Sequence, residues 1–128
     1  MPGKRKDKLY KYEMHTNIME KIYGTLTQIG ISKSEAAIVE LMSDHKPRTS
    51  REIEHELYLA QPVVSTITRQ IKDFLSIEES GGVQSRPKKT YLMTKARFNA
   101  YLQNISNQKE IELNTIIAAL VKLREISA

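Results

Sequence analysis

Apolar residues recur at intervals of three and four along most of the chain, which is the period of amphipathic helices. Residues 9–29 carry such a stripe and end at Gly30, a residue suited to the left-handed backbone that follows a helix. Ser32 and Glu35 have the spacing of a capping box, which predicts the start of a second helix. That helix is expected to close at His45, so that the histidine lies in its last turn.

Two further helices are predicted in the middle of the chain. Thr49 and Glu52 repeat the capping spacing and predict a short helix. Its inward side chains are expected to be Ile53, Leu57 and Tyr58. Because proline is tolerated in the first turn of a helix, the next helix is predicted to begin at Gln61–Pro62 and to run to about Leu75. Its apolar stripe comprises Val64, Ile67, Ile71 and Phe74.

The period changes to two after this helix. Residues 77–80 and 90–94 are predicted strands, with a turn at Gly81–Gly82 and a polar, basic loop over 84–89. A lone two-stranded hairpin is marginally stable in water, so this hairpin must lean on the helices.

Residues 96–126 return to the helical period. Polar residues interrupt the pattern over 104–108, which allows either one long helix or two helices with a kink. The second half is apolar over more than half of its circumference, so it needs a second surface to cover it. We expect residues 9–29 and 96–126 to pair with those of a second copy.

Composition narrows the function classes. The chain has 128 residues with 40% hydrophobic and 27% charged side chains, which is typical of a globular protein. No cysteine is present, so thiol chemistry is excluded, and the three histidines lack zinc-ligand spacing. No cofactor, no metal site and no enzyme are therefore expected. The start is basic without the apolar core of a signal peptide and no apolar run could span a membrane, so we expect a cytoplasmic protein.

Charge and polarity point to a nucleic acid. The net charge is +5, and residues 45–95 hold nine basic against six acidic side chains. The DNA major groove admits one α-helix, and short hydroxyl side chains, arginine and glutamine can bond to base edges there. Basic residues of the loop could reach the neighbouring groove or its phosphates. The candidate DNA-binding residues are Gln61, Ser65, Thr66, Thr68, Arg69 and Lys72 in the helix and Arg86, Lys88 and Lys89 in the loop.

These features resemble winged-helix transcriptional regulators of prokaryotes. The run Gln61–Ser65 is similar to the start of the recognition helix in ArsR repressors, and the 90–94 strand resembles a wing strand. The long end helices are more similar in layout to the MarR family and to the archaeal TrmB regulators. The resemblance implies a homodimer, with Gln61–Lys72 as recognition helix and Arg86–Lys89 as wing tip. The metal sensing of ArsR proteins does not carry over, because no metal-binding box is present.

The sequence therefore predicts a mainly α protein with a small β-hairpin, a winged helix-turn-helix whose long N- and C-terminal helices form a dimer interface. The expected organisation is a basic flexible tail (1–8), an N-terminal dimerisation helix (9–30), the DNA-binding domain (31–95) and a C-terminal dimerisation helix (96–128). The expected function is sequence-specific regulation of transcription on double-stranded DNA. A small-molecule effector is compatible with it, although nothing in the sequence indicates one.

Two alternatives remain at this point. A protein–protein adaptor on the same scaffold would use the apolar C-terminal helix for a foreign partner. Binding of RNA or single strands would need an aromatic stacking platform, for which Tyr91 is the nearby candidate.

Overall fold

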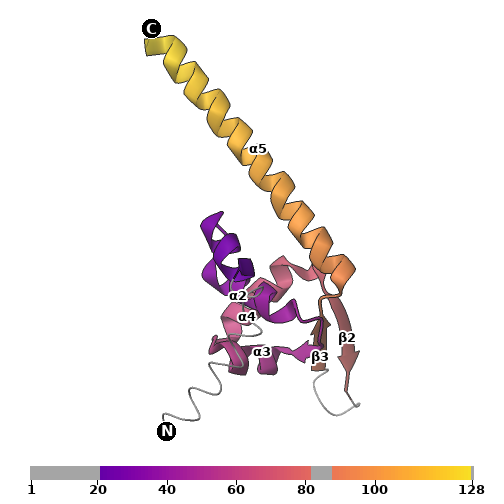
Figure 1. Cartoon of the computed structure of the whole chain (residues 1–128). Coiled ribbons are helices and arrows are strands. Elements are labelled where there is room, and N and C mark those ends of the chain that lie inside the picture. Colours follow the sequence, from indigo (N-terminus) through magenta and orange to yellow (C-terminus); the bar gives the residue numbers. More distant parts are fainter. Residues whose placement is uncertain (1–20, 82–87, 128) are drawn as a thin grey trace.

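The structure, a computed structural model, describes residues 21–81 and 88–127. Short helices and three short strands form a small domain, from which one long helix, α5 (Lys95–Ser127), projects (Figure 1). The predicted mainly helical winged helix-turn-helix is confirmed for the described residues, while the dimer interface of the long end helices stays a prediction. The predicted tail and most of the first helix fall in residues 1–20, outside the described residues.

Local signals define the first described elements well. Residues 21–28 are helical, and Gly30 follows with a φ of +97°, as predicted for the residue that ends the helix. Helix α2 (Lys33–Met42) begins after Ser32, whose hydroxyl accepts a hydrogen bond from the Glu35 N–H at 3.2 Å. The helix ends before His45, so the prediction that His45 lies in its last turn is wrong. His45 has a φ of +62°, and its Nδ1 lies 2.9 Å from the Met93 carbonyl oxygen.

Helix α3 (Ser50–Leu57) has the complete capping box that the sequence predicts, with Thr49 and Glu52 bonding to each other's backbone N–H. Its last cap residue, Tyr58, has a φ of +53° and is 94% exposed. The expectation that Tyr58 faces inward is therefore wrong. Leu57 and Leu59 on either side of it turn inward instead and pack against the core.

Helix α4 (Gln61–Gln70) begins with proline in its first turn, as predicted. It ends earlier than the expected Leu75, because Ile71 leaves the helical conformation and a 3₁₀ turn, η1 (Lys72–Phe74), follows. Contacts with the long C-terminal helix hold this turn. The Arg97 guanidinium donates a hydrogen bond to the Asp73 carbonyl oxygen at 3.0 Å.

The predicted hairpin is present as β2 (Ser76–Ser80) and β3 (Lys88–Leu92), which pair antiparallel with Ser76 opposite Leu92 and Ser80 opposite Lys88. A third strand that the sequence did not reveal, β1 (Arg48–Thr49), pairs with the other edge of β3 and gives the order β1-β3-β2. The second strand ends two residues earlier than predicted, because Thr94 caps the next helix through its hydroxyl.

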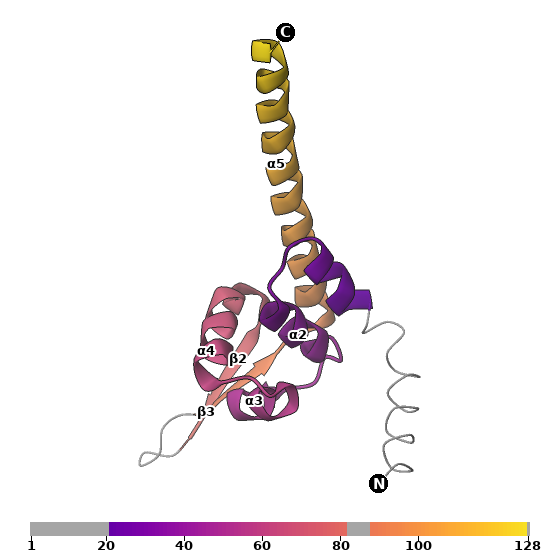
Figure 2. The ribbon, with the colours of Figure 1, turned by 90° about the vertical axis from the view of Figure 1, so that its left-hand side faces the viewer.

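Helix α5 (Lys95–Ser127) is continuous over 33 residues, which decides between the one-helix and two-helix alternatives. At a rise of 1.5 Å per residue it is about 50 Å long. Its first turns pack on the domain, and the remainder extends away from it (Figures 1 and 2).

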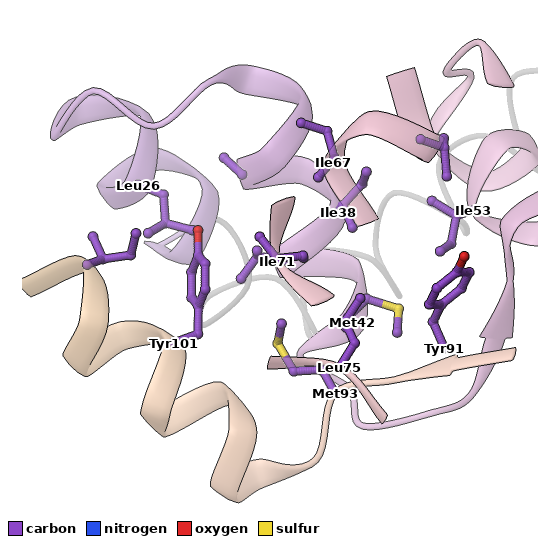
Figure 3. Close-up of a cluster of buried hydrophobic side chains, with 14 residues drawn as sticks. Leu26, Ile38, Met42, Ile53, Ile67, Ile71, Leu75, Tyr91, Met93 and Tyr101 are labelled. Atoms are coloured by element: carbon purple, nitrogen blue, oxygen red, sulfur yellow. The ribbon is translucent and has the colours of Figure 1, made fainter. Parts of the chain in front are cut away.

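The core lies where α2, α3, α4 and the sheet meet the base of α5 (Figure 3). The predicted stripe of α4 contributes Val64, Ile67 and Ile71, all less than 10% exposed. Five of the first eight residues of α4 (63, 64, 66, 67 and 68) are β-branched and weak helix formers, so this packing must hold the helix. Within the described part of the chain, no buried side-chain nitrogen or oxygen lacks a hydrogen-bond partner.

None of the described helices is both long and apolar enough to cross a membrane. Across residues 21–81 and 88–127, no group of three or more side chains is arranged to hold a metal ion.

Candidate nucleic-acid interface

The outer side of α4 carries the predicted polar face. Gln61, Thr66 and Arg69 are exposed, and Ser65 is half-buried between them. The Arg69 guanidinium donates a hydrogen bond to the Ser65 hydroxyl at 3.3 Å, which draws the arginine back along the helix. The Thr66 hydroxyl donates to the Pro62 carbonyl oxygen and keeps its lone pairs for a further donor. The core packs against the opposite side of α4, so this face is available to a ligand.

Two other candidates of this helix lie elsewhere. Thr68 is 4% exposed, and its hydroxyl donates to the Val64 carbonyl oxygen at 2.8 Å. It faces the core because it adjoins the buried Val64–Ile67–Ile71 stripe, so it belongs to the packing and not to the polar face. Lys72 is exposed but lies beyond the end of α4, in η1.

An open groove of about 630 Å³ separates α4 from the wing. Its lining includes Gln61 at the start of α4, Lys88 and Lys89 of β3, and Arg51 in the first turn of α3. Three basic side chains and one acid, Glu54, face this groove. The Lys89 ammonium lies 4.0 Å from the Glu79 carboxylate across the hairpin, but both side chains are more than half exposed. Such an exposed pair is weak and leaves Lys89 able to bind an anion.

The structure changes the set of candidate residues in two ways. Arg51 joins it, although the sequence marked the surrounding run only as a helix cap. The sequence signal for Arg51 is its place in the first turn of α3, on the side of the helix away from Ile53, which is buried. Tyr91, the candidate for stacking on a single strand, is 8% exposed and belongs to the core. Arg86 lies outside the described residues.

A buried arginine holds the elements around the groove together. The Arg48 guanidinium donates to both carboxylate oxygens of Asp44 at 2.8 and 2.6 Å, to Glu56 at 3.2 Å and to the Leu41 carbonyl oxygen. These bonds tie the end of α2, strand β1 and helix α3 to one side chain. Burial alone would raise the pKa of Asp44, but the hydrogen bonds from Arg48 and from the backbone outweigh it and lower that pKa.

The base of α5 is fixed to the domain by a second buried contact. The Tyr101 hydroxyl donates to the Glu35 carboxylate on α2 at 2.5 Å, and the Tyr101 ring packs edge-on against Phe74 with centroids 5.6 Å apart. Burial raises the pKa of Tyr101 strongly, and the hydrogen bond to Glu35 adds to this rise. Since Phe74 belongs to η1, Tyr101 also links the long helix to the turn that follows α4.

The distal half of α5 is apolar and uncovered in the single chain. Eight large apolar side chains are between 43% and 81% exposed, namely Ile111, Leu113, Ile116, Ile117, Leu120, Val121, Leu123 and Ile126. A contiguous exposed apolar surface of this kind marks an interaction site.

No family model and no curated protein matches this chain. Among solved structures, a transcriptional regulator is 18% identical with a TM-score of 0.49, covering 88% of this chain and 75% of its own. A MarR family regulator from Neisseria meningitidis is 17% identical with a TM-score of 0.46, covering 94% and 95%. MepR of S. aureus, in a complex with DNA, is 18% identical with a TM-score of 0.44, covering 93% and 99%. The chain is similar to these structures at identities below 20% and TM-scores below 0.5.

Proposed function

We propose that this chain is a sequence-specific, double-stranded DNA-binding transcriptional regulator that acts as a homodimer. The observation that carries the proposal is the exposed polar face of α4 beside a groove lined with basic residues of the wing and of α3. The major groove accepts one helix of this kind, while basic side chains beside it bind the flanking phosphates. No enzymatic role is needed to account for these residues.

Each part of the surface has its own task in this proposal. The N-terminal half of α4 enters the major groove with Gln61, Ser65 and Thr66 toward base edges. Arg69 lies one turn further along and contacts guanine through two bonds after leaving the Ser65 hydroxyl. The remaining basic residues bind phosphates; they are Arg51, Lys72, Lys88 and Lys89, with Arg86 at the wing tip.

The apolar half of α5 pairs with a second copy. Leu113, Ile116, Leu120 and Leu123 follow one another at spacings of three, four and three, which is the seam of a coiled coil. Residues 9–29 complete this dimer interface. Two copies related by a twofold axis present two α4 helices to successive major grooves, about 34 Å apart on the duplex.

A foreign protein partner for α5 is the second candidate function, and the same exposed apolar residues favour it. The two differ in stoichiometry and in nucleic-acid binding. A regulator forms a stable dimer that binds duplex DNA. An adaptor remains a monomer until its partner is present.

The test is an anisotropy titration of a labelled mixed-sequence duplex at several salt concentrations, with light scattering on the same sample. We expect a dimer whose log affinity falls with log salt at a slope of magnitude about 5 or more, since each phosphate contact releases a counterion. No binding at about 50 mM salt refutes the proposal.

Variants then assign the roles. On a selected site, Arg69→Ala should cost about 1–3 kcal/mol, while Lys88→Ala should weaken all sequences alike and reduce the salt slope by about 1. Lys122→Ala is the matched control, because it removes the same charge from the distal part of α5. Unchanged binding by Arg69→Ala would remove base recognition from this face.

A further inference from the structure

The turn between α3 and α4 holds an unusual residue. Tyr58 occupies the left-handed conformation, with φ of 53° and ψ of 42°, at the position where helices most often end in glycine. This conformation is unfavourable for a side chain with a Cβ, and rarest for bulky ones. A tyrosine here is therefore held by its surroundings at some expense of stability.

The surroundings explain the backbone but not the side chain. The Tyr58 and Leu59 N–H groups both donate to the Glu54 carbonyl oxygen, and the neighbouring leucines pack against the core. Glycine would satisfy the same contacts without strain. The phenol ring is 94% exposed, and its hydroxyl has no hydrogen-bond partner in the described part of the chain. The contacts among the described residues therefore do not account for a tyrosine side chain at this position.

Its position matches the proposed DNA-binding end of the molecule. Tyr58 lies three residues before Gln61, the first residue of α4. The turn that carries it and the open end of the β2–β3 hairpin both lie at the end of the domain opposite to the projecting part of α5 (Figures 1 and 2). When the first turn of a recognition helix enters the major groove, the residues just before it lie at the rim, where the phosphates run. A tyrosine hydroxyl is a common donor to phosphate oxygens.

We propose that Tyr58 is a DNA-positioning residue whose hydroxyl donates a hydrogen bond to a backbone phosphate at the rim of the groove that α4 enters. This inference rests on the proposed function and extends it to a residue outside the predicted set. Because the contact is to the backbone, it sets the depth and orientation of α4 on every sequence. Because tyrosine is neutral, it does so without releasing a counterion.

The test compares Tyr58→Phe and Tyr58→Asn with the unaltered chain. Asparagine tolerates the left-handed conformation, so its variant should melt at the same or a higher temperature. Both variants lack the phenol hydroxyl, and we expect each to bind a mixed-sequence duplex about tenfold more weakly, the usual effect of a hydrogen bond to a charged group. The slope of log affinity against log salt should stay unchanged, whereas Lys88→Ala reduces it by about 1.

Several outcomes overturn the inference. Unchanged affinity of Tyr58→Asn shows that the side chain does not contact DNA. Unchanged affinity of Tyr58→Phe, with a loss in Tyr58→Asn, assigns the effect to the ring and removes the phosphate bond. A lower melting temperature in parallel with the lost affinity shows a merely structural role. Failure of the unaltered chain to bind any duplex refutes the proposed function itself, which distinguishes the two.

Discussion

The hydrogen bond between Tyr101 and Glu35 allows a quantitative test of how the long helix is held on the domain. Tyr101→Phe removes the hydroxyl and keeps the ring against Phe74, so no cavity forms. A hydrogen bond to a charged group contributes about 1.5–3 kcal/mol. Since Glu35 is half-buried and regains water, we expect the low end, a loss of about 1.5 kcal/mol in the free energy of unfolding at pH 7.

The same bond predicts an alkaline pH dependence. The pKa of Tyr101 is raised in the folded protein, by burial and by Glu35, above its value of about 10 in the unfolded chain. Its stabilising contribution is therefore complete below pH 10 and is lost as the pH rises toward the folded pKa. Through this group, each pH unit above 10 lowers the free energy of unfolding of the unaltered chain by about 1.4 kcal/mol. Tyr101→Phe lacks the hydroxyl and does not undergo this loss. The difference between them should vanish near pH 11.

Urea unfolding of both proteins at pH 7, 9, 10 and 11, at one protein concentration, measures this difference. Taking the difference cancels the titration of other tyrosines and lysines, which both proteins share. A difference that stays constant between pH 7 and 11 would refute the reasoning, because it would mean that Tyr101 loses its proton equally easily in both states. No difference at pH 7 would show that the hydrogen bond contributes nothing.

Three further outcomes are expected. Leu120→Glu places a charge in the proposed apolar seam of α5 and should convert the proposed homodimer into a monomer, seen by light scattering; a persistent dimer would exclude this seam. Arg48→Met should lower the free energy of unfolding by about 2 kcal/mol at pH 7, because it removes the hydrogen bonds that the buried guanidinium donates to Asp44, Glu56 and the Leu41 carbonyl oxygen. The pKa of Asp44 is lowered in the fold, so the contribution of this pair is present above pH 4 and should fade in urea titrations as the pH falls below it. Thr68→Val should leave duplex affinity within twofold in the anisotropy assay, since its hydroxyl bonds only within α4; a large loss would return Thr68 to the DNA-binding face.

Signals that act over a few residues could be recognised in the sequence. The caps at Ser32 and Thr49, the proline that opens α4 and the glycine after residue 29 each depend on groups within four positions. The hydrophobic period depends on the same short range, and it predicted the helices and the hairpin in their observed order. For this reason the winged-helix arrangement and most of the polar face of α4 followed from the amino-acid sequence alone.

Tertiary contacts decided the rest. The sequence did not reveal that η1 ends α4 early, because Arg97 and Tyr101, which hold that turn, lie more than twenty residues away. The burial of Thr68 likewise depends on how wide a side of α4 the core covers, which periodicity does not specify. Strand β1 has only two residues and exists through its pairing with β3. The outward position of Tyr58 followed from the inward turn of the leucines on both sides, a choice that only the packed core makes.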